Sequence, residues 1–133
     1  MAARSVQASG SVVMVRPHHF RPNPETHADN AFQTVAAAQP GEVEAAALAE
    51  FDAAAQRLSD AGVTVHVFDD RGRATPDSVF PNNWFSTHHG GRVALYPMYA
   101  PSRRLERRAD VVELLKREYR VQEVIDYSGL EYD

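Results

Sequence analysis

The first half of the chain combines two short apolar runs with one long helical pattern. Residues 11–17 (SVVMVRP) form an apolar, valine-rich run that ends at a proline, which is typical of a buried strand. Residues 42–61 are rich in helix formers, and Gly62 favours a helix end. Residues 63–68 (VTVHVF) alternate as a strand does, so a strand–helix–strand unit is expected. The buried helix face is predicted to comprise Val43, Leu48, Phe51, Ala55 and Leu58.

The second half predicts a related unit. Residues 78–87 (SVFPNNWFST) are expected to form a strand, and Gly90-Gly91 a turn into a returning strand at 92–98. A helix is expected next, with Ser102 as its N-cap, and residues 121–127 close as a strand. Two units of roughly 55–60 residues indicate a repeated βαβ-type module. The buried stripe of the second helix is predicted as Leu105, Ala109, Val112, Leu115 and Tyr119.

The length of 133 residues fits one α/β domain. We expect a flexible tail over residues 1–10 and a domain over 11–133, with modules at roughly 11–70 and 75–127. The proline-rich segment after residue 17 is expected to be a long ordered loop that becomes helical near Asp29. The chain stops at SGLEYD without a capping element, which we interpret as a truncation.

Composition excludes several classes of function. A net charge of -4 and a pI near 5.8 argue against nucleic acid as the main partner. No apolar run approaches the roughly 20 residues of a membrane helix, and the start lacks the apolar core of a secretory signal. The absence of cysteine excludes disulfides, thiolate zinc sites and cysteine catalysis within these residues. We therefore expect a cytoplasmic protein without nucleic-acid or membrane partners.

Polar residues interrupt the segment 75–85 (TPDSVFPNNWF) at positions suited to a ligand. Asp77 is expected at the mouth of a strand, where ligand groups gather. Asn82 and Asn83 each offer an amide carbonyl and an NH₂ group, and buried amides need partners that a polar ligand would supply. The alternative is a turn in which the asparagines bind backbone groups.

Arg103 follows a helix start, where a guanidinium can bind a carboxylate through two hydrogen bonds. The alternative is a surface arginine, because its neighbours form a basic cluster that resembles a solvated helical face with i,i+3 pairs. The cluster comprises Arg103, Arg104, Arg107 and Arg108, beside Glu106 and Asp110.

The histidines do not predict a metal site. There is no HExxH motif, and the neighbours in His18-His19 and His88-His89 would point to opposite faces of a strand. His66 lies within an apolar strand and is expected to be half-buried, with its hydrogen bonds satisfied.

Two longer segments carry a family resemblance. MVRPHHFRPNPETHADNAFQ and PDSVFPNNWFSTHHGGRVALYPMYAPSRRLERR resemble citrulline-utilisation hydrolases and, more distantly, dimethylarginine dimethylaminohydrolases, arginine deiminases and amidinotransferases. The resemblance covers most of residues 12–133. It implies the pentein fold, a five-bladed α/β propeller of ββαβ modules around a polar channel, of which this chain would supply about two modules.

The resemblance also implies roles for individual residues. Asp77 matches an aspartate that contacts the amino-acid end of the substrate, and Arg103 matches the arginine that binds the α-carboxylate. Asn82 and Asn83 replace acidic residues that hold a cationic guanidinium in dimethylarginine relatives. The expected substrate is citrulline or an arginine derivative, and neutral amides suit a neutral ureido group, which favours citrulline over arginine. A backbone carbonyl near Phe20 is expected to meet the α-amino group.

The implied reaction needs no cofactor. A cysteine thiolate attacks the ureido or guanidino carbon, and a histidine protonates the departing nitrogen and then activates water. In the family both groups come from later modules, so this chain alone is expected to be inactive. Citrulline would yield ornithine, ammonia and carbon dioxide. The alternative function is a non-catalytic module that binds an amino acid or a partner without a nucleophile.

Overall fold

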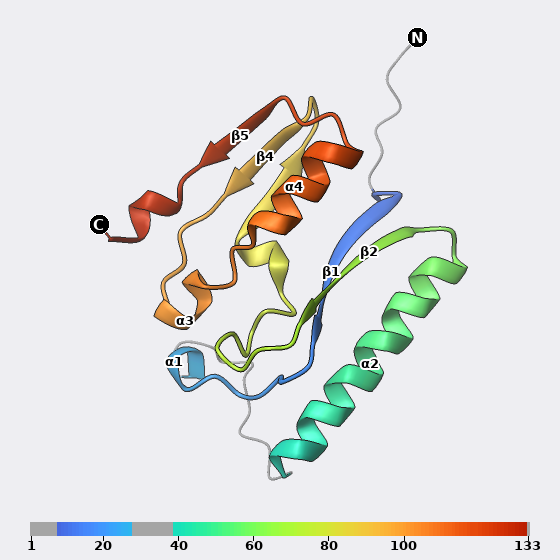
Figure 1. Cartoon of the computed structure of the whole chain (residues 1–133), viewed down its shortest axis with the longest axis vertical. Helices are drawn as coiled ribbons and strands as arrows, with labels where there is room; N and C mark the ends of the chain where they lie inside the picture. The colour runs from blue at the N-terminus through green and yellow to red at the C-terminus, as the bar shows by residue number, and fades with distance from the viewer. Residues whose placement is uncertain (1–7, 28–38, 133) are drawn as a thin grey trace.

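The computed structural model describes residues 8–27 and 39–132. In the first unit, β1 (Ser11–Pro17) pairs in parallel with β2 (Thr64–Asp70), and α2 (Pro40–Asp60) connects them. Parallel strands need such a crossover. Helix α2 lies along the two-stranded sheet and buries Phe51 from its predicted face (Figure 1). The predicted tail lies mostly, and the predicted helical turn at Asp29 wholly, outside the described residues.

The second unit is a three-stranded sheet in the order β3-β4-β5. Strand β3 (Phe85–His88) is antiparallel to β4 (Arg92–Leu95), and β5 (Glu123–Asp126) is parallel to β4. Helix α4 (Ala109–Glu118) connects β4 to β5 and lies beside this sheet (Figure 1). The predicted element order and the mixed α/β class are thus confirmed. The propeller stays a prediction.

The two units share one hydrophobic core. Val13 of β1 and Phe68 of β2 pack against the buried cluster of the second unit. Trp84 and Val111 are its most completely buried members, at 1% and 0% exposure. The first unit therefore packs against the second through the sheet formed by β1 and β2. The buried cluster comprises Trp84, Phe85, Val93, Met98, Val111 and Leu115.

The predicted strand over residues 78–87 is wrong in its first half. Backbone hydrogen bonds there close local turns, with Phe80 N donating to Asp77 O and Asn83 N to Phe80 O. A 3-10 helix, η1 (Pro81–Asn83), follows, and the strand begins only at Phe85. Proline lacks an N–H and cannot donate to a strand ladder, which favours turns here. Asp77 therefore lies in a turn and not at the mouth of a strand.

The predicted second helix is split. Helix α3 (Pro101–Arg104) ends before α4 begins, and Ala100, not Ser102, is the N-cap of α3. The break changes the helical phase between α3 and α4. A single buried face predicted across both helices is therefore wrong. Leu105 is 65% exposed and Tyr119 38% exposed, although both were expected in the buried stripe. Val111 and Leu115 are the buried residues of α4.

The β3–β4 turn gives a stability prediction. Gly90 and Gly91 have φ angles of 85° and 74°. A Cβ on Gly91 would collide with the backbone carbonyl of Arg120, whereas one on Gly90 would meet open space. Both alanine variants incur a left-handed strain of about 1–2 kcal/mol, and only Gly91→Ala adds the clash. We expect Gly91→Ala to unfold at a lower urea concentration than Gly90→Ala. Equal midpoints would contradict this close approach.

Candidate functional site

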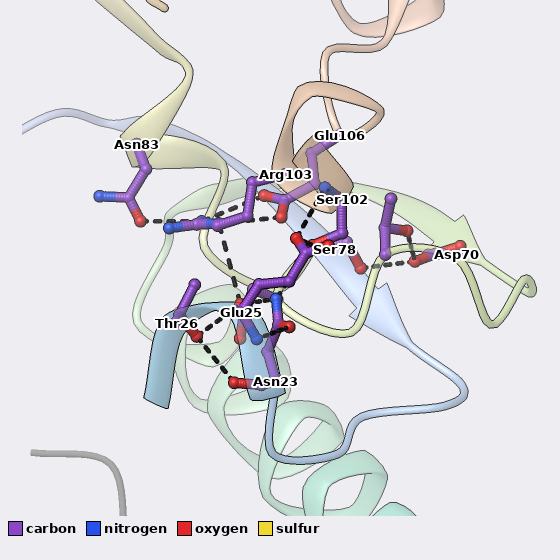
Figure 2. A network of polar contacts seen from close by, with 11 residues as sticks. Asn23, Glu25, Thr26, Asp70, Ser78, Asn83, Ser102, Arg103 and Glu106 are labelled. Carbon is purple, nitrogen blue, oxygen red and sulfur yellow. Dashed lines mark hydrogen bonds and ion pairs between the residues drawn. The ribbon is translucent and has the colours of Figure 1, made fainter. Parts of the chain in front are cut away.

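Three segments far apart in the sequence meet around Asn23, which is 2% exposed. Its Nδ2 donates to Asp77 Oδ2 at 2.8 Å and to Ser102 Oγ at 3.1 Å. Its Oδ1 accepts the backbone N–H of Glu25 at 3.1 Å. One buried amide thus joins the loop after β1, the turn after β2 and helix α3 (Figure 2).

Glu25 caps α3 from outside the helix. It lies in the short helix α1 (Pro24–His27), and its Oε2 accepts Ser102 N–H at 3.0 Å and Ser102 Oγ–H at 2.6 Å. These bonds, the side-chain bond first, lower the pKa of Glu25. A carboxylate from a distant loop therefore satisfies the N-terminus of α3 in place of the predicted Ser102 cap.

Arg103 lies between Asn83 and Glu106 (Figure 2). Its Nε and Nη2 donate to the two oxygens of Glu106 at 2.9 and 3.1 Å, and Nη2 also donates to Asn83 Oδ1 at 3.1 Å. Arg103 Nε lies 3.9 Å from Asp77 Oδ2, and the two side chains are 16% and 14% exposed. Within the described residues, Nη1 of Arg103 has no hydrogen-bond acceptor. The alternative of a surface arginine is therefore wrong.

Glu106 is a buried carboxylate, although its neighbours in the sequence predict a solvated helical face. It is 3% exposed. Burial raises its pKa, the hydrogen bond and charge of Arg103 oppose that shift, and the charges of Asp77 and Asp70 add to it. The site thus holds three carboxylates near one guanidinium.

Asp70, at the end of β2, supports the turn that carries Asp77. Its Oδ2 accepts the hydroxyls of Thr75 and Ser78, each at 2.6 Å. Asp70, Thr75, Ser78 and Glu106 also line a cavity of about 280 Å³. Because these hydroxyls belong to the turn that carries Asp77, they hold that turn against the end of β2.

The structure brings together Asp77, Asn83 and Arg103 of the predicted ligand residues. Asn82 instead lines a larger groove of about 800 Å³ that is bordered by β1, β3 and β4. Phe20 is half-buried in the loop after β1 and lines neither this groove nor the smaller cavity. The predicted cluster is therefore divided between two surfaces.

The remaining arginines of the basic cluster are engaged as well. Arg107 donates through Nη1 and Nη2 to Glu131, at 2.7 Å each, and the Glu131 side chain is 2% exposed. This contact lowers the pKa of Glu131. Arg104 donates to Met98 O, and Arg108 to Asp69 O. The expected solvated face is thus wrong. Arg104 and Arg107 bond the segment after β4 and Glu131, and Arg108 bonds the end of β2.

The histidines and the helices add further findings. His66 Nε2 lies 2.7 Å from Tyr119 Oη, so the prediction of a satisfied, half-buried histidine is confirmed. Across residues 8–27 and 39–132, no group of three His, Cys, Asp or Glu side chains is arranged to hold a metal ion. Over the same ranges no helix has both the length and the hydropathy to span a bilayer.

The comparison with known families covers nearly the whole described chain. A family model described as N,N dimethylarginine dimethylhydrolase, eukaryotic, matches residues 16–133. The matched range includes every residue of the network around Asn23 and Arg103. Neither a curated protein nor a solved structure matches the chain. The chain belongs to the eukaryotic N,N dimethylarginine dimethylhydrolase family, a branch of the pentein superfamily of enzymes that hydrolyse a guanidino C–N bond in arginine derivatives.

Proposed function

We propose that this chain supplies the amino-acid-binding part of a hydrolase that acts on citrulline. The observation that carries the proposal is the pair of Asp77 and Arg103, which lie 3.9 Å apart and are both largely buried. That separation is too long for a hydrogen bond. A free amino acid carries the two complementary charges, an ammonium group for Asp77 and a carboxylate for Arg103.

Both side chains keep binding capacity for such a ligand. Among the described residues, the hydrogen bonds of Asp77 go to Oδ2, from Asn23 and Thr26, so Oδ1 is left for an ammonium group. Arg103 keeps Nη1 for a carboxylate. Both groups are held by other side chains, so little conformational entropy is lost on binding.

The neighbouring amide of Asn83 favours a neutral far end of the ligand. Asn83 accepts from Arg103 through its Oδ1, which leaves its NH₂ group as a donor. A ureido oxygen accepts such a bond, whereas a guanidinium only donates. With Asn83 in place of an acidic residue of the dimethylarginine relatives, citrulline is the preferred substrate.

The catalytic groups of this proposal come from outside these residues, because the chain has no cysteine. A thiolate attacks the ureido carbon, the C–N bond to ornithine breaks, and a histidine protonates the departing nitrogen. The histidine then activates water, which hydrolyses the S-carbamoyl intermediate and frees the thiolate without a cofactor. The carbamate released decomposes to ammonia and carbon dioxide, so the products are ornithine, ammonia and carbon dioxide. The second candidate is a binding module without catalysis, which the same missing nucleophile favours. Citrulline hydrolysis by the reading frame extended past residue 133 decides between them.

Substituting the amide of Asn83 tests the choice of substrate. The variant Asn83→Glu is expected to shift the ratio of citrulline to arginine affinity by roughly tenfold toward arginine, since a carboxylate near a cation contributes on the order of 1 kcal/mol or more. Calorimetric titration of the chain with both ligands measures the ratio. The control, Asn83→Ala, should weaken citrulline binding without favouring arginine. An unchanged ratio in the acidic variant would contradict the electrostatic argument.

A further inference from the structure

We propose that Glu106 is a positioning residue, which holds Arg103 in the orientation that receives a ligand carboxylate. The inference rests on the proposed function of the Asp77 and Arg103 pair. Glu106 lies on the side of Arg103 that faces the protein interior, and its side chain is 1% exposed. Both of its oxygens already accept hydrogen bonds from Arg103, so we expect Glu106 to act on a ligand through Arg103.

The hydrogen-bond pattern divides the guanidinium into two edges. Glu106 takes the Nε and Nη2 edge with both oxygens, at 2.9 and 3.1 Å. Both N–H groups of Nη2 are used, one by Glu106 and one by Asn83, so the two N–H groups of Nη1 remain. Because a guanidinium is planar, fixing the Nε and Nη2 edge also fixes the direction of Nη1. Glu106 thus holds Nη1 ready for an incoming carboxylate.

Glu106 also keeps Arg103 apart from Asp77. Arg103 has another carboxylate 3.9 Å away at Asp77, and the hydrogen bonds to Glu106 are the charged contacts that oppose a direct bond between them. Without a charge at position 106, Arg103 is expected to close on Asp77. The two charges would then satisfy each other, and a ligand would have to break their bond before entering.

The direction of the pKa shift of Glu106 agrees with a role in positioning Arg103 and not with a role in stabilising the fold. Burial raises its pKa above the ordinary 4.5 despite Arg103. A carboxylate whose folded pKa is raised contributes stability below its unfolded pKa, and that contribution is lost as the pH rises through the folded pKa. Ionisation of Glu106 therefore costs stability, and the hydrogen bond and charge of Arg103 offset part of this cost.

Glu106→Gln in the whole chain tests the inference. The variant keeps the volume and one acceptor, and Arg103 keeps Asp77 as a counter-ion. We expect a melting temperature equal to or above that of the wild type by circular dichroism, and citrulline affinity weakened about tenfold by calorimetry. A purely structural role would lower the melting temperature and leave the affinity of the folded fraction unchanged. The control, Glu113→Gln, removes an exposed partner of Lys116 and should change neither.

A second variant and a measurement without ligand test separately whether Glu106 orients Arg103. Glu106→Asp keeps the charge but is too short to reach both nitrogens, so it should fold and also bind citrulline more weakly. Nitrogen-15 NMR of the Arg103 Nε–H reports the contact with Glu106 directly, and its chemical shift should change in Glu106→Gln, because the carboxylate acceptor is removed. If the wild type binds no amino acid, the proposed function fails. The NMR signal then still tests whether Glu106 fixes the orientation of Arg103. An unchanged Nε–H signal, or wild-type citrulline affinity in Glu106→Gln, overturns the inference.

Discussion

Replacing Arg103 with methionine is expected to weaken citrulline binding by roughly a hundredfold, because truncating one partner of a buried charge pair costs about 2–5 kcal/mol. Arg103 is the site's remaining cationic donor for a carboxylate within the described residues, since Arg108 is bonded to Asp110 and to Asp69 O. Methionine keeps the apolar stem of arginine and removes all of its N–H donors. Calorimetric titration of the chain with citrulline measures the loss.

A lysine at the same position separates charge from geometry. Arg103→Lys keeps the positive charge but lacks the planar fork that bonds Glu106 and Asn83 together. We expect an affinity between those of the wild type and Arg103→Met. Circular dichroism should show that both variants remain folded. Citrulline affinity within twofold of the wild type in Arg103→Met would mean that Arg103 does not bind the ligand.

Trp84→Ala is expected to have the largest effect on stability, a loss of about 3–5 kcal/mol in the free energy of unfolding. Trp84 is 1% exposed, and its ring packs against Phe85 with centroids 4.6 Å apart. Its backbone also joins η1 to β4, because Trp84 O accepts Tyr96 N–H at 2.9 Å. The cavity would therefore lie beneath the segment that carries Asn82 and Asn83.

The stability loss is best measured by urea unfolding followed by far-ultraviolet circular dichroism. Trp84 is the single tryptophan of the chain, so its fluorescence would vanish in the variant. Phe80→Ala is the matched control, since this nearby aromatic side chain is 46% exposed. Phe80→Ala should change the free energy of unfolding by about 0.5 kcal/mol or less. Similar losses in both variants would contradict the described core.

The order of strands and helices could be predicted because it follows from local periodicity. The runs at 11–17, 63–68 and 121–127 each appear as a strand within a few residues of the expected bounds. The turns at 75–83 could not be predicted in the same way, because Val79 and Phe80 have strand-like side chains. Local hydrogen bonds around two prolines decide the conformation there.

The site was predicted in part. The motifs placed Asp77, Asn83 and Arg103 in one cluster, and the structure brings these three together. Asn23 was missed, although it lies in the quoted NPET segment, because its partners are 54 and 79 residues away in the sequence. Glu106 was missed because an i,i+3 charge pair has the same pattern on a solvated face as in a buried site.

The most direct test of the account uses ligands that each lack one of the two charges. Titrating the chain with citrulline, with N-acetylcitrulline and with citrulline amide separates the Asp77 contact from the Arg103 contact. We predict measurable heat with free citrulline, and a weakening of about tenfold or more when either the amino or the carboxyl group is blocked. No heat with citrulline, or equal heats with all three ligands, would contradict the claim that these opposite charges bind the two ends of a free amino acid.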